Sequence, residues 1–109
     1  MVIVNLDLSP VEYIEYQLRL LLGNEVNTLS KGQLKILSYF YKYRNVKEAS
    51  SVILDSKLRT SKKSIANDLT TFGEHGLKWL KVQEGNIEFI EAFRLKESPD
   101  EFLVKIKVN

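Results

Sequence analysis

Residues 60–77, TSKKSIANDLTTFGEHGL, constrain the fold of this chain more than any other stretch. Ile65, Leu69 and Phe72 follow one another at i, i+4 and i+7, which is the spacing of one face of an α-helix. Such a face is buried against neighbouring elements, so the polar residues between these positions must point outward. The stretch therefore predicts an amphipathic helix at about residues 61–75.

The two ends of this helix carry signals of their own. Ser61 or Thr60 supplies a hydroxyl that can cap a helix N-terminus, and the break at Arg59-Thr60 is short enough to turn the chain sharply. Gly76 fits the left-handed position that ends many helices, and Leu77 is expected to return the chain to the core. The helix should therefore cross the preceding one at a steep angle.

A second helix is predicted upstream by a capping box. Ser30 and Gln33 have the required spacing, and a run rich in apolar residues continues from there to Lys42 or Tyr43. At helical spacing most of its aromatic rings are expected in the core rather than available for base stacking: Tyr39, Phe40, Tyr41 and Tyr43. This helix is the expected centre of the packing.

A third helix and a hairpin flank the helix at 61–75. Asn45, with Glu48 three residues later, predicts a helix start, and apolar positions continue through Ile53 to Leu58. KWLKVQEGNIEFIEAF, residues 78–93, has the pattern of two strands around a turn at Glu84-Gly85-Asn86. The middle of the chain is thus expected to contain three helices followed by a β-hairpin.

The two ends of the chain add further predicted elements. MVIVNLDL, residues 1–8, is typical of a short strand, and Ser9-Pro10 with Glu12 begins a helix that Gly23 ends. The inward face of that helix is expected to hold Val11, Ile14, Leu18 and Leu21. EFLVKIKVN, residues 101–109, alternates like a strand, although residues 98–101 also resemble a helix start.

The element order and the residues of the middle segment together resemble a known superfamily. ILDSKLRTSKKSIANDLTTFGEHGL, residues 53–77, is similar to the helix-turn-helix of small bacterial, archaeal and phage winged-helix regulators. The likeness covers about residues 30–91 and rests on paired leucines, a helix cap, an apolar triplet and a closing Gly-Leu: Leu54, Leu58, Ser61, Ile65, Leu69, Phe72, Gly76 and Leu77. It implies an α+β, mainly helical fold.

In that reading the chain is one domain over residues 1–109. A winged helix-turn-helix core at 30–91 carries an added N-terminal strand and helix at 1–28 and a C-terminal segment at 92–109 that contains a strand. The two ends of the chain either pair as one small sheet or form a subunit interface. Both alternatives use the same apolar segments.

The resemblance also implies a function for the helix at 61–75, because the first two turns of this helix usually enter the major groove of DNA. Lysine donates to guanine acceptors, asparagine pairs with an adenine edge, and a helix N-terminus attracts a phosphate. We expect a transcriptional regulator that contacts double-stranded DNA through Arg59, Thr60, Ser61, Lys62, Lys63, Ser64, Asn67, Thr70, Thr71, Lys78 and Lys81. Further phosphate contacts are expected among Lys31, Lys35, Lys47 and Lys57.

The distribution of charge agrees with this function. The chain has a net charge of +2, but residues 31–81 hold eleven basic and four acidic residues, a balance of +7, whereas residues 1–30 stand at −3 and residues 82–109 at −2. A basic segment is typical of a nucleic-acid partner. An ordinary solvated surface would show the same balance, so charge alone does not decide.

Three acidic residues depart from the winged-helix pattern. Glu84 and Glu88 lie at the wing, where a wing that follows DNA is normally basic, and Asp55 stands where the family has a small apolar residue. DNA binding by one copy is therefore expected to be weak, and we expect a homodimer built largely from residues 1–25 and 100–109. The alternative function is a protein-binding winged-helix adaptor that docks onto a polymerase, a replication complex or another regulator.

Catalysis, cofactors and membranes are not expected. The single histidine, His75, lies beside the expected end of a helix, where an imidazolium complements the helix dipole. The chain has no cysteine, no phosphate loop and no HExxH spacing, so we expect neither an enzyme nor a metal site. It also has no apolar run of roughly 20 residues and no signal peptide pattern. We expect a cytoplasmic protein, in the host cytoplasm if its origin is viral.

Overall fold

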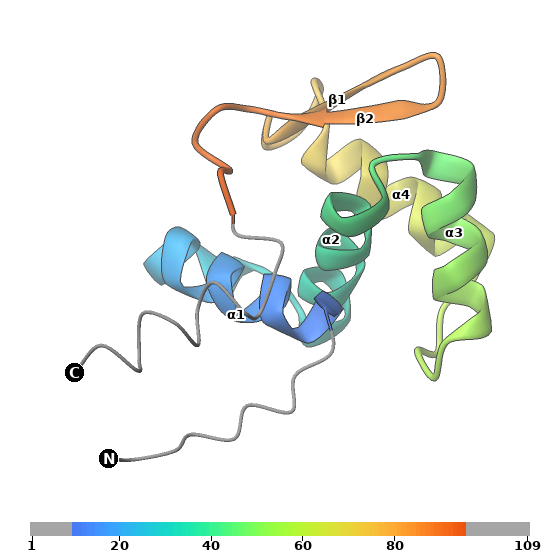
Figure 1. The fold of residues 1–109 in the computed structure, drawn as a ribbon, viewed down its shortest axis with the longest axis horizontal. Coiled ribbons are helices and arrows are strands. Elements are labelled where there is room, and N and C mark those ends of the chain that lie inside the picture. The colour runs from blue at the N-terminus through green and yellow to red at the C-terminus, as the bar shows by residue number, and fades with distance from the viewer. Residues whose placement is uncertain (1–9, 96–109) are drawn as a thin grey trace.

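Residues 10–95 are described by the structure, a computed structural model shown in Figure 1. Its elements in chain order are α1 (Pro10–Leu22), the 3₁₀ helix η1 (Gly23–Thr28), α2 (Lys31–Tyr43), α3 (Val46–Asp55), α4 (Lys62–Phe72), β1 (Leu80–Gln83) and β2 (Asn86–Phe89). The predicted α+β, mainly helical class is confirmed. The predicted strand at 1–8, the Ser9 cap and the predicted strand at 101–109 lie outside the described residues.

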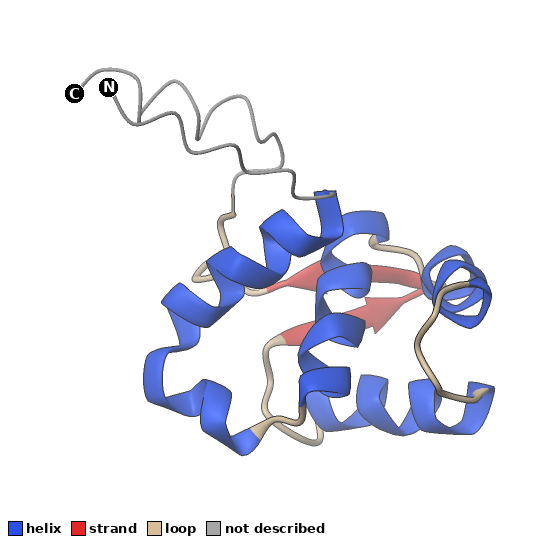
Figure 2. Ribbon diagram, turned by 90° about the horizontal axis from the view of Figure 1, so that it is seen from below, coloured by secondary structure: helices blue, strands red, loops and turns tan. Residues whose placement is uncertain are grey.

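α2 is the central helix of the fold. Figures 1 and 2 show it between α1 on one side and α3 with α4 on the other, with the hairpin across one end. Its start confirms the predicted capping box, because the Ser30 hydroxyl accepts from the Gln33 amide and the Gln33 side chain accepts from the Ser30 amide, both at 3.1 Å. A helix packed from several sides buries residues around much of its circumference: Leu34, Ile36, Leu37, Phe40 and Tyr41.

The aromatic residues of α2 divide into two groups. Phe40 and Tyr41 are buried, as predicted. Tyr39 and Tyr43 are half-buried, and their rings stack with centroids 6.5 Å apart.

Within residues 10–95, no helix combines the length and the apolar content that crossing a bilayer requires.

α1 packs on α2 through a face that differs in part from the prediction. Ile14 and Leu18 are fully buried as expected, but Leu21 is 44% exposed and Leu22 is buried in its place. The buried row therefore advances by four residues at each step, which is one of the two ridges that helices use when they pack together. Gly23 follows the helix as predicted and has a φ of +54°, a conformation that glycine adopts without strain.

α3 is shorter than predicted, so the connection to α4 is longer. The helix begins at the predicted cap, where the Asn45 side chain accepts an amide hydrogen bond of 2.9 Å, but it ends at Asp55 rather than near Leu58. The Ser56 hydroxyl donates to the Ile53 carbonyl at 2.6 Å and accepts from the Leu58 amide at 3.2 Å. These local bonds offer the backbone an alternative to another helical turn. Residues 56–61, and not a two-residue break, join the helices.

α4 begins where predicted and ends earlier. The Ser61 hydroxyl accepts from the Ser64 amide at 3.2 Å and caps the helix, which continues to Phe72. Gly73 is the C-cap, with φ of −86° and ψ of −162°. The predicted end near residue 75, with a left-handed Gly76, is therefore wrong.

The turn after α4 explains why residue 76 is nevertheless a glycine. A Cβ on Gly76 would lie 2.0 Å from the Thr71 carbonyl oxygen, so no larger residue fits without moving the backbone. The Leu77 amide donates to the same carbonyl at 2.8 Å. The Leu77 side chain is 42% exposed, so the predicted return to the core at this position is wrong. Trp79 and Leu80 return the chain to the core instead.

β1 and β2 form the predicted antiparallel hairpin, in which residues 80–83 pair with residues 86–89. Glu84 and Gly85 form its turn, with φ of +53° and +80°. Positive φ at both central residues is the type I′ geometry, whose twist matches that of the two strands. The turn is thus one residue shorter than the predicted Glu84-Gly85-Asn86, because Asn86 already belongs to β2.

The hairpin is tied to the corner between α2 and α3. Asn45 and Asn86 form an isolated antiparallel bridge. Two backbone hydrogen bonds of 2.9 Å flank it, one from Val46 to Gly85 and one from Ile87 to Arg44. The orientation of the hairpin relative to the helices is therefore fixed by backbone pairing as well as by side chains.

A chain of aromatic rings in contact, which we call the aromatic cluster, joins α4, the hairpin and α2. It consists of Phe72, Trp79, Phe93, Phe89 and Tyr41, with successive ring centroids 5.7, 5.7, 5.5 and 5.0 Å apart. The Tyr41 hydroxyl donates to the Phe93 carbonyl at 3.1 Å and accepts from the Leu95 amide at 2.9 Å. The segment after β2 is thereby held against the central helix.

Candidate nucleic-acid interface

α4 presents one polar row to solvent. Ile65 and Phe72 are buried and Leu69 is half-buried, which confirms the predicted inward face. At 3.6 residues per turn the opposite side of the helix carries Lys63, Asn67 and Thr70, and all three residues are exposed. We call these three the outward row. Figure 2 shows α4 along an outer edge of the molecule, away from α1.

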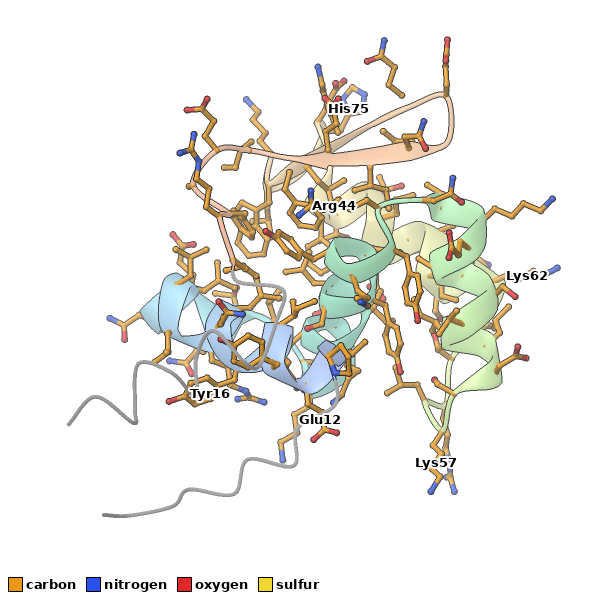
Figure 3. The ribbon with its side chains drawn as sticks, viewed as in Figure 1. Glu12, Tyr16, Arg44, Lys57, Lys62 and His75 are labelled. Atoms are coloured by element: carbon orange, nitrogen blue, oxygen red, sulfur yellow. The ribbon has the colours of Figure 1, made fainter. Side chains whose placement is uncertain are left out.

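The two flanks of α4 face different neighbours. Lys62 and Ala66 lie toward α3 and line a groove between the two helices. Figure 3 shows the Lys62 side chain pointing away from the body of the molecule on this side. Ser64 and Asp68 lie on the other flank and line a polar pocket beside the start of α2. Lys62 and Ser64, both predicted DNA contacts, therefore lie at the edges of the outward row.

A side-chain hydrogen bond joins α2 to one flank of α4. Gln33 Nε2 donates to Asp68 Oδ1 at 3.2 Å, while Oε1 of the same side chain completes the Ser30 capping box. The Asp68 carboxylate is thereby turned toward α2 and not toward the outward row. Sequence reasoning missed this positioning role of Gln33, since the capping-box spacing indicates a local partner and gives no signal for one 35 residues away.

The N-terminus of α4 offers backbone donors. The Ser61 hydroxyl accepts a hydrogen bond from the Ser64 amide, and the Ser61 carbonyl accepts one from the Ile65 amide at 3.0 Å. Within residues 10–95, the amides of Lys62 and Lys63 have no hydrogen-bond partner. Unpaired amides at a helix start, together with the positive end of the helix dipole, favour an anion. The Ser61 hydroxyl itself is committed to capping.

The two threonines turn their hydroxyl hydrogens toward the helix. Thr70 Oγ1 donates to the Ala66 carbonyl at 3.0 Å, and Thr71 Oγ1 donates to the Asn67 carbonyl at 2.9 Å. In this arrangement each hydroxyl can still accept a hydrogen bond from outside, and its methyl group remains for apolar contact. Thr70 belongs to the outward row, whereas Thr71 lies on the flank of Ser64.

The remaining predicted DNA contacts lie beyond the ends of α4. Arg59 and Thr60 precede the helix, whereas Lys78 and Lys81 follow it at the base of the hairpin. Lys81 Nζ lies 3.7 Å from Glu88 Oε2, and both lysines border a hollow of about 420 Å³ that Glu74 and Glu88 also line. α4 has 11 residues and is about 16 Å long, so its length separates these two groups of predicted contacts. Arg59 and Thr60 lie at its start, Lys78 and Lys81 lie beyond its end, and the outward row lies between them.

The four lysines proposed for additional phosphate contacts have different surroundings. Lys35 Nζ lies 2.6 Å from Glu15 Oε2 on α1, so this charge is already paired. Lys47 borders the groove between α3 and α4, and Lys57 lies in the connection between those helices, where Figure 3 shows it pointing outward. Lys31 is exposed at the first residue of α2. Of these four lysines, Lys47 shares the margin of this groove with Lys62 of α4, whereas Lys35 is turned toward α1.

His75 lies in the turn after α4 and is exposed, near the hairpin in Figure 3. It is not in the last turn of the helix, because α4 ends at Phe72. Among residues 10–95, no group of three or more histidine, cysteine, aspartate or glutamate side chains lies close enough to hold a metal ion.

Comparison of the chain with protein-family models, with curated proteins and with solved structures finds no match.

Proposed function

We propose that the protein binds double-stranded DNA as a winged helix-turn-helix regulator, with α4 in the major groove. The observation that carries this proposal is the outward row, where a lysine, an asparagine and a threonine lie exposed on one line of a helix whose opposite side is buried. Lysine can donate to guanine O6 and N7, and asparagine pairs with adenine N6 and N7. The threonine methyl group suits the thymine methyl group.

The contacts that hold α4 in place favour its use as a helix that reads base edges. A reading helix must be held in one orientation so that its side chains meet base edges in a fixed register. α4 is held on one flank by the Gln33–Asp68 hydrogen bond of 3.2 Å and at its C-terminus by the stacking of Phe72 on Trp79. The hairpin takes the place of the wing, because it follows this helix directly and is bridged to the α2–α3 corner at Asn45 and Asn86.

Phosphate binding at the start of α4 would set the depth of the helix in the groove. The unpaired amides of Lys62 and Lys63 are at this end, and the exposed Arg59 precedes them in the chain. Backbone amides at a helix start are frequent phosphate ligands in protein–DNA complexes. In this proposal they position the helix, and the outward row supplies base contacts.

A second copy of the chain belongs to the proposal. One outward row is short, and DNA regulators commonly extend their contact by binding two half-sites as a dimer. The proposed interface uses residues 1–25 and 100–109. Its described part includes α1, where Leu20 is 67% exposed and Leu21 is 44% exposed. A monomer mass in light scattering that does not change with concentration would exclude the dimer.

The test of DNA binding begins with selection of bound sequences from a random duplex pool. On the selected duplex, replacing both Lys63 and Asn67 by alanine should weaken binding about 30-fold or more, since each base contact contributes about 1–3 kcal/mol. The Lys63 change should also reduce the salt dependence by about one counterion. The thermal midpoint should change little because both positions are exposed.

A matched control makes the same chemical changes away from α4. Lys42 and Asn27 are both exposed and lie outside the proposed interface. The Lys42→Ala/Asn27→Ala variant should bind the selected duplex like the unmodified protein. Equal affinity of the two double variants would refute the placement of α4 in the groove, and failure of the unmodified protein to retain any duplex at low salt would refute DNA binding itself.

The protein-binding adaptor is retained as a second candidate because of the wing. Glu84 and Glu88 are exposed there, and Val82 and Ile90 are 43% and 45% exposed. Acidic groups beside apolar side chains are suited to a protein surface rather than to phosphates. A partner from the transcription or replication machinery is the proposed ligand of this surface.

A further inference from the structure

A groove lies between α3 and α4, on the flank of α4 that carries Lys62 and Ala66. Its volume is about 470 Å³. The floor is apolar and comes from both helices: Val46, Leu54, Ile65, Ala66 and Leu69. Small-molecule sites in proteins are typically hollows of roughly 300–1,000 Å³ with mostly apolar linings and a few polar groups. The groove has that size and that composition.

The packing of the two helices leaves this groove open. Leu54 on α3 is 37% exposed, and Leu69 on α4 is only partly buried, although both side chains border the groove. Asp55 closes α3 as an exposed residue at the groove margin and does not fill the space between the helices. An apolar ligand in the groove would remove the exposed leucine surface from water.

The charges at the margin select the kind of ligand. Lys47 and Lys62 border the groove, against the single carboxylate of Asp55, which leaves an excess of one positive charge. Lys47 lies in the first turn of α3 and Lys62 in the first turn of α4, so each stands at the positive end of a helix dipole. We infer that the groove binds a small amphipathic organic anion, with an apolar body on the floor and a carboxylate or sulfonate beside the lysines.

Such a ligand would regulate DNA binding, an inference that rests on the proposed function. Lys62 and Ala66 line the groove and lie on the flank of α4 next to the outward row. A bound anion there would neutralise Lys62 and place its negative charge near the DNA backbone. DNA and the anion would therefore weaken one another, and by thermodynamic linkage the factor must be the same in both directions.

The binding experiment uses 1-anilinonaphthalene-8-sulfonate as the probe, in the absence of DNA. Its fluorescence should rise and saturate at one probe per chain. The neutral N-phenyl-1-naphthylamine, which lacks the sulfonate, should bind more weakly. Lys47→Gln should weaken binding of the sulfonate probe about threefold or more because a charge-assisted contact is lost, while binding of the neutral probe stays unchanged. Lys42→Gln, which alters an exposed lysine outside the groove, is the matched control.

Two changes to the walls locate the probe. Leu54→Gln should weaken both probes, and Ser51→Trp should block both by filling the groove from an exposed position of α3. Two variants are used so that a folding defect in one leaves the other informative, with the thermal midpoint as the check. Three outcomes would each overturn the inferred site. The fluorescence fails to saturate, both wall variants bind the probes like the unmodified protein, or Lys47→Gln and Lys42→Gln have equal effects.

The linkage experiment separates this inference from the proposed function. If the protein binds the selected duplex, the sulfonate probe should lower its DNA affinity in the unmodified protein and not in the Ser51→Trp variant. If the probe binds in the groove and DNA affinity does not change, the regulatory inference fails while the DNA proposal stands. If no duplex is bound but the probe saturates, the DNA proposal fails and the groove remains a ligand site.

Discussion

α4 and the hairpin share one anchor and present opposite chemistry. Both are attached to the aromatic cluster, α4 through Phe72 and the hairpin through Phe89. On its exposed side α4 carries Lys63, Asn67 and Thr70, whereas the hairpin carries Glu84 at its tip and Glu88 paired with Lys81 at 3.7 Å. Two neighbouring surfaces of one small fold therefore suit different partners: the helix suits an anionic groove with polar base edges, and the hairpin suits a basic or apolar protein surface.

The difference shows that one set of residues holds α4 and the hairpin in place and another set forms their exposed surfaces. The rings that hold the two elements together are buried or half-buried, and the residues that distinguish the two surfaces make few contacts with the core. Substitutions in the first set should change stability, and substitutions in the second set should change binding with little effect on folding.

The largest effect is expected for Phe72→Ala, which removes the ring that joins α4 to Trp79. Phe72 is fully buried, and its ring lies 5.7 Å from that of Trp79. Truncation of a buried phenylalanine typically costs about 3–5 kcal/mol. Urea unfolding followed by the fluorescence of the single tryptophan should show this loss. Leu77→Ala, at a 42% exposed position, is the control and should cost less than about 1 kcal/mol.

An intermediate effect is expected for Tyr41→Phe, which keeps the ring and removes the hydroxyl. That hydroxyl donates to the Phe93 carbonyl at 3.1 Å and accepts from the Leu95 amide at 2.9 Å. Loss of a partner for buried polar groups costs about 1–3 kcal/mol. Hydrogen exchange should become faster in the hairpin and residues 90–95 while α4 keeps its protection. Equal loss of protection in α4 would show that the two elements unfold as one unit and would break the comparison.

Local signals in the sequence were sufficient for the starts of α2, α3 and α4 and for the presence of the hairpin. The Ser30–Gln33 capping box, the Asn45 and Ser61 caps and the hairpin turn are each built from residues a few positions apart. The outward row followed from helical spacing once the inward face was known. These features need no knowledge of the rest of the chain.

The features that the sequence could not reveal depend on contacts between distant segments. The rotation of α1, which buries Leu22 and exposes Leu21, is set by packing on α2. The Gln33–Asp68 contact spans 35 residues. The early end of α3 had a local signal in Ser56, but serine hydroxyls bond their own backbone in several ways, so the residue type alone does not fix the boundary. The groove at Leu54 appears only when two helices are placed side by side.

A smaller effect is expected for Gln33→Ala, which tests the positioning of α4. The change removes one half of the capping box and the hydrogen bond to Asp68, so it should cost about 1–2 kcal/mol. Ser30→Ala is the matched control because it removes the other half of the box and leaves Asp68 untouched. A double-mutant cycle of Gln33→Ala with Asp68→Ala should give a coupling of about 0.5–1 kcal/mol. A coupling of zero would mean that this contact does not fix the rotation of α4.

The smallest effect, a gain of stability, is expected at the tip of the hairpin. Glu84 has a φ of +53° at the first central position of the turn, and Gly85 follows with +80°. Asparagine adopts this left-handed conformation more readily than glutamate, and Asn-Gly is the preferred pair for a type I′ turn. Glu84→Asn should therefore stabilise the protein by a few tenths to about 1 kcal/mol in urea unfolding.

Glu84→Gln separates charge from conformation at the same position. It removes the negative charge and keeps a side chain that is strained at positive φ, so it should leave stability unchanged. If the wing is turned away from the duplex, neither variant should alter retention on DNA. If both increase retention at low salt while only Glu84→Asn raises stability, the acidic tip lies near phosphates and repels them. The helix and the wing would then contact the same DNA, and the acidic residue at the tip of the wing would lower the affinity of that single interface.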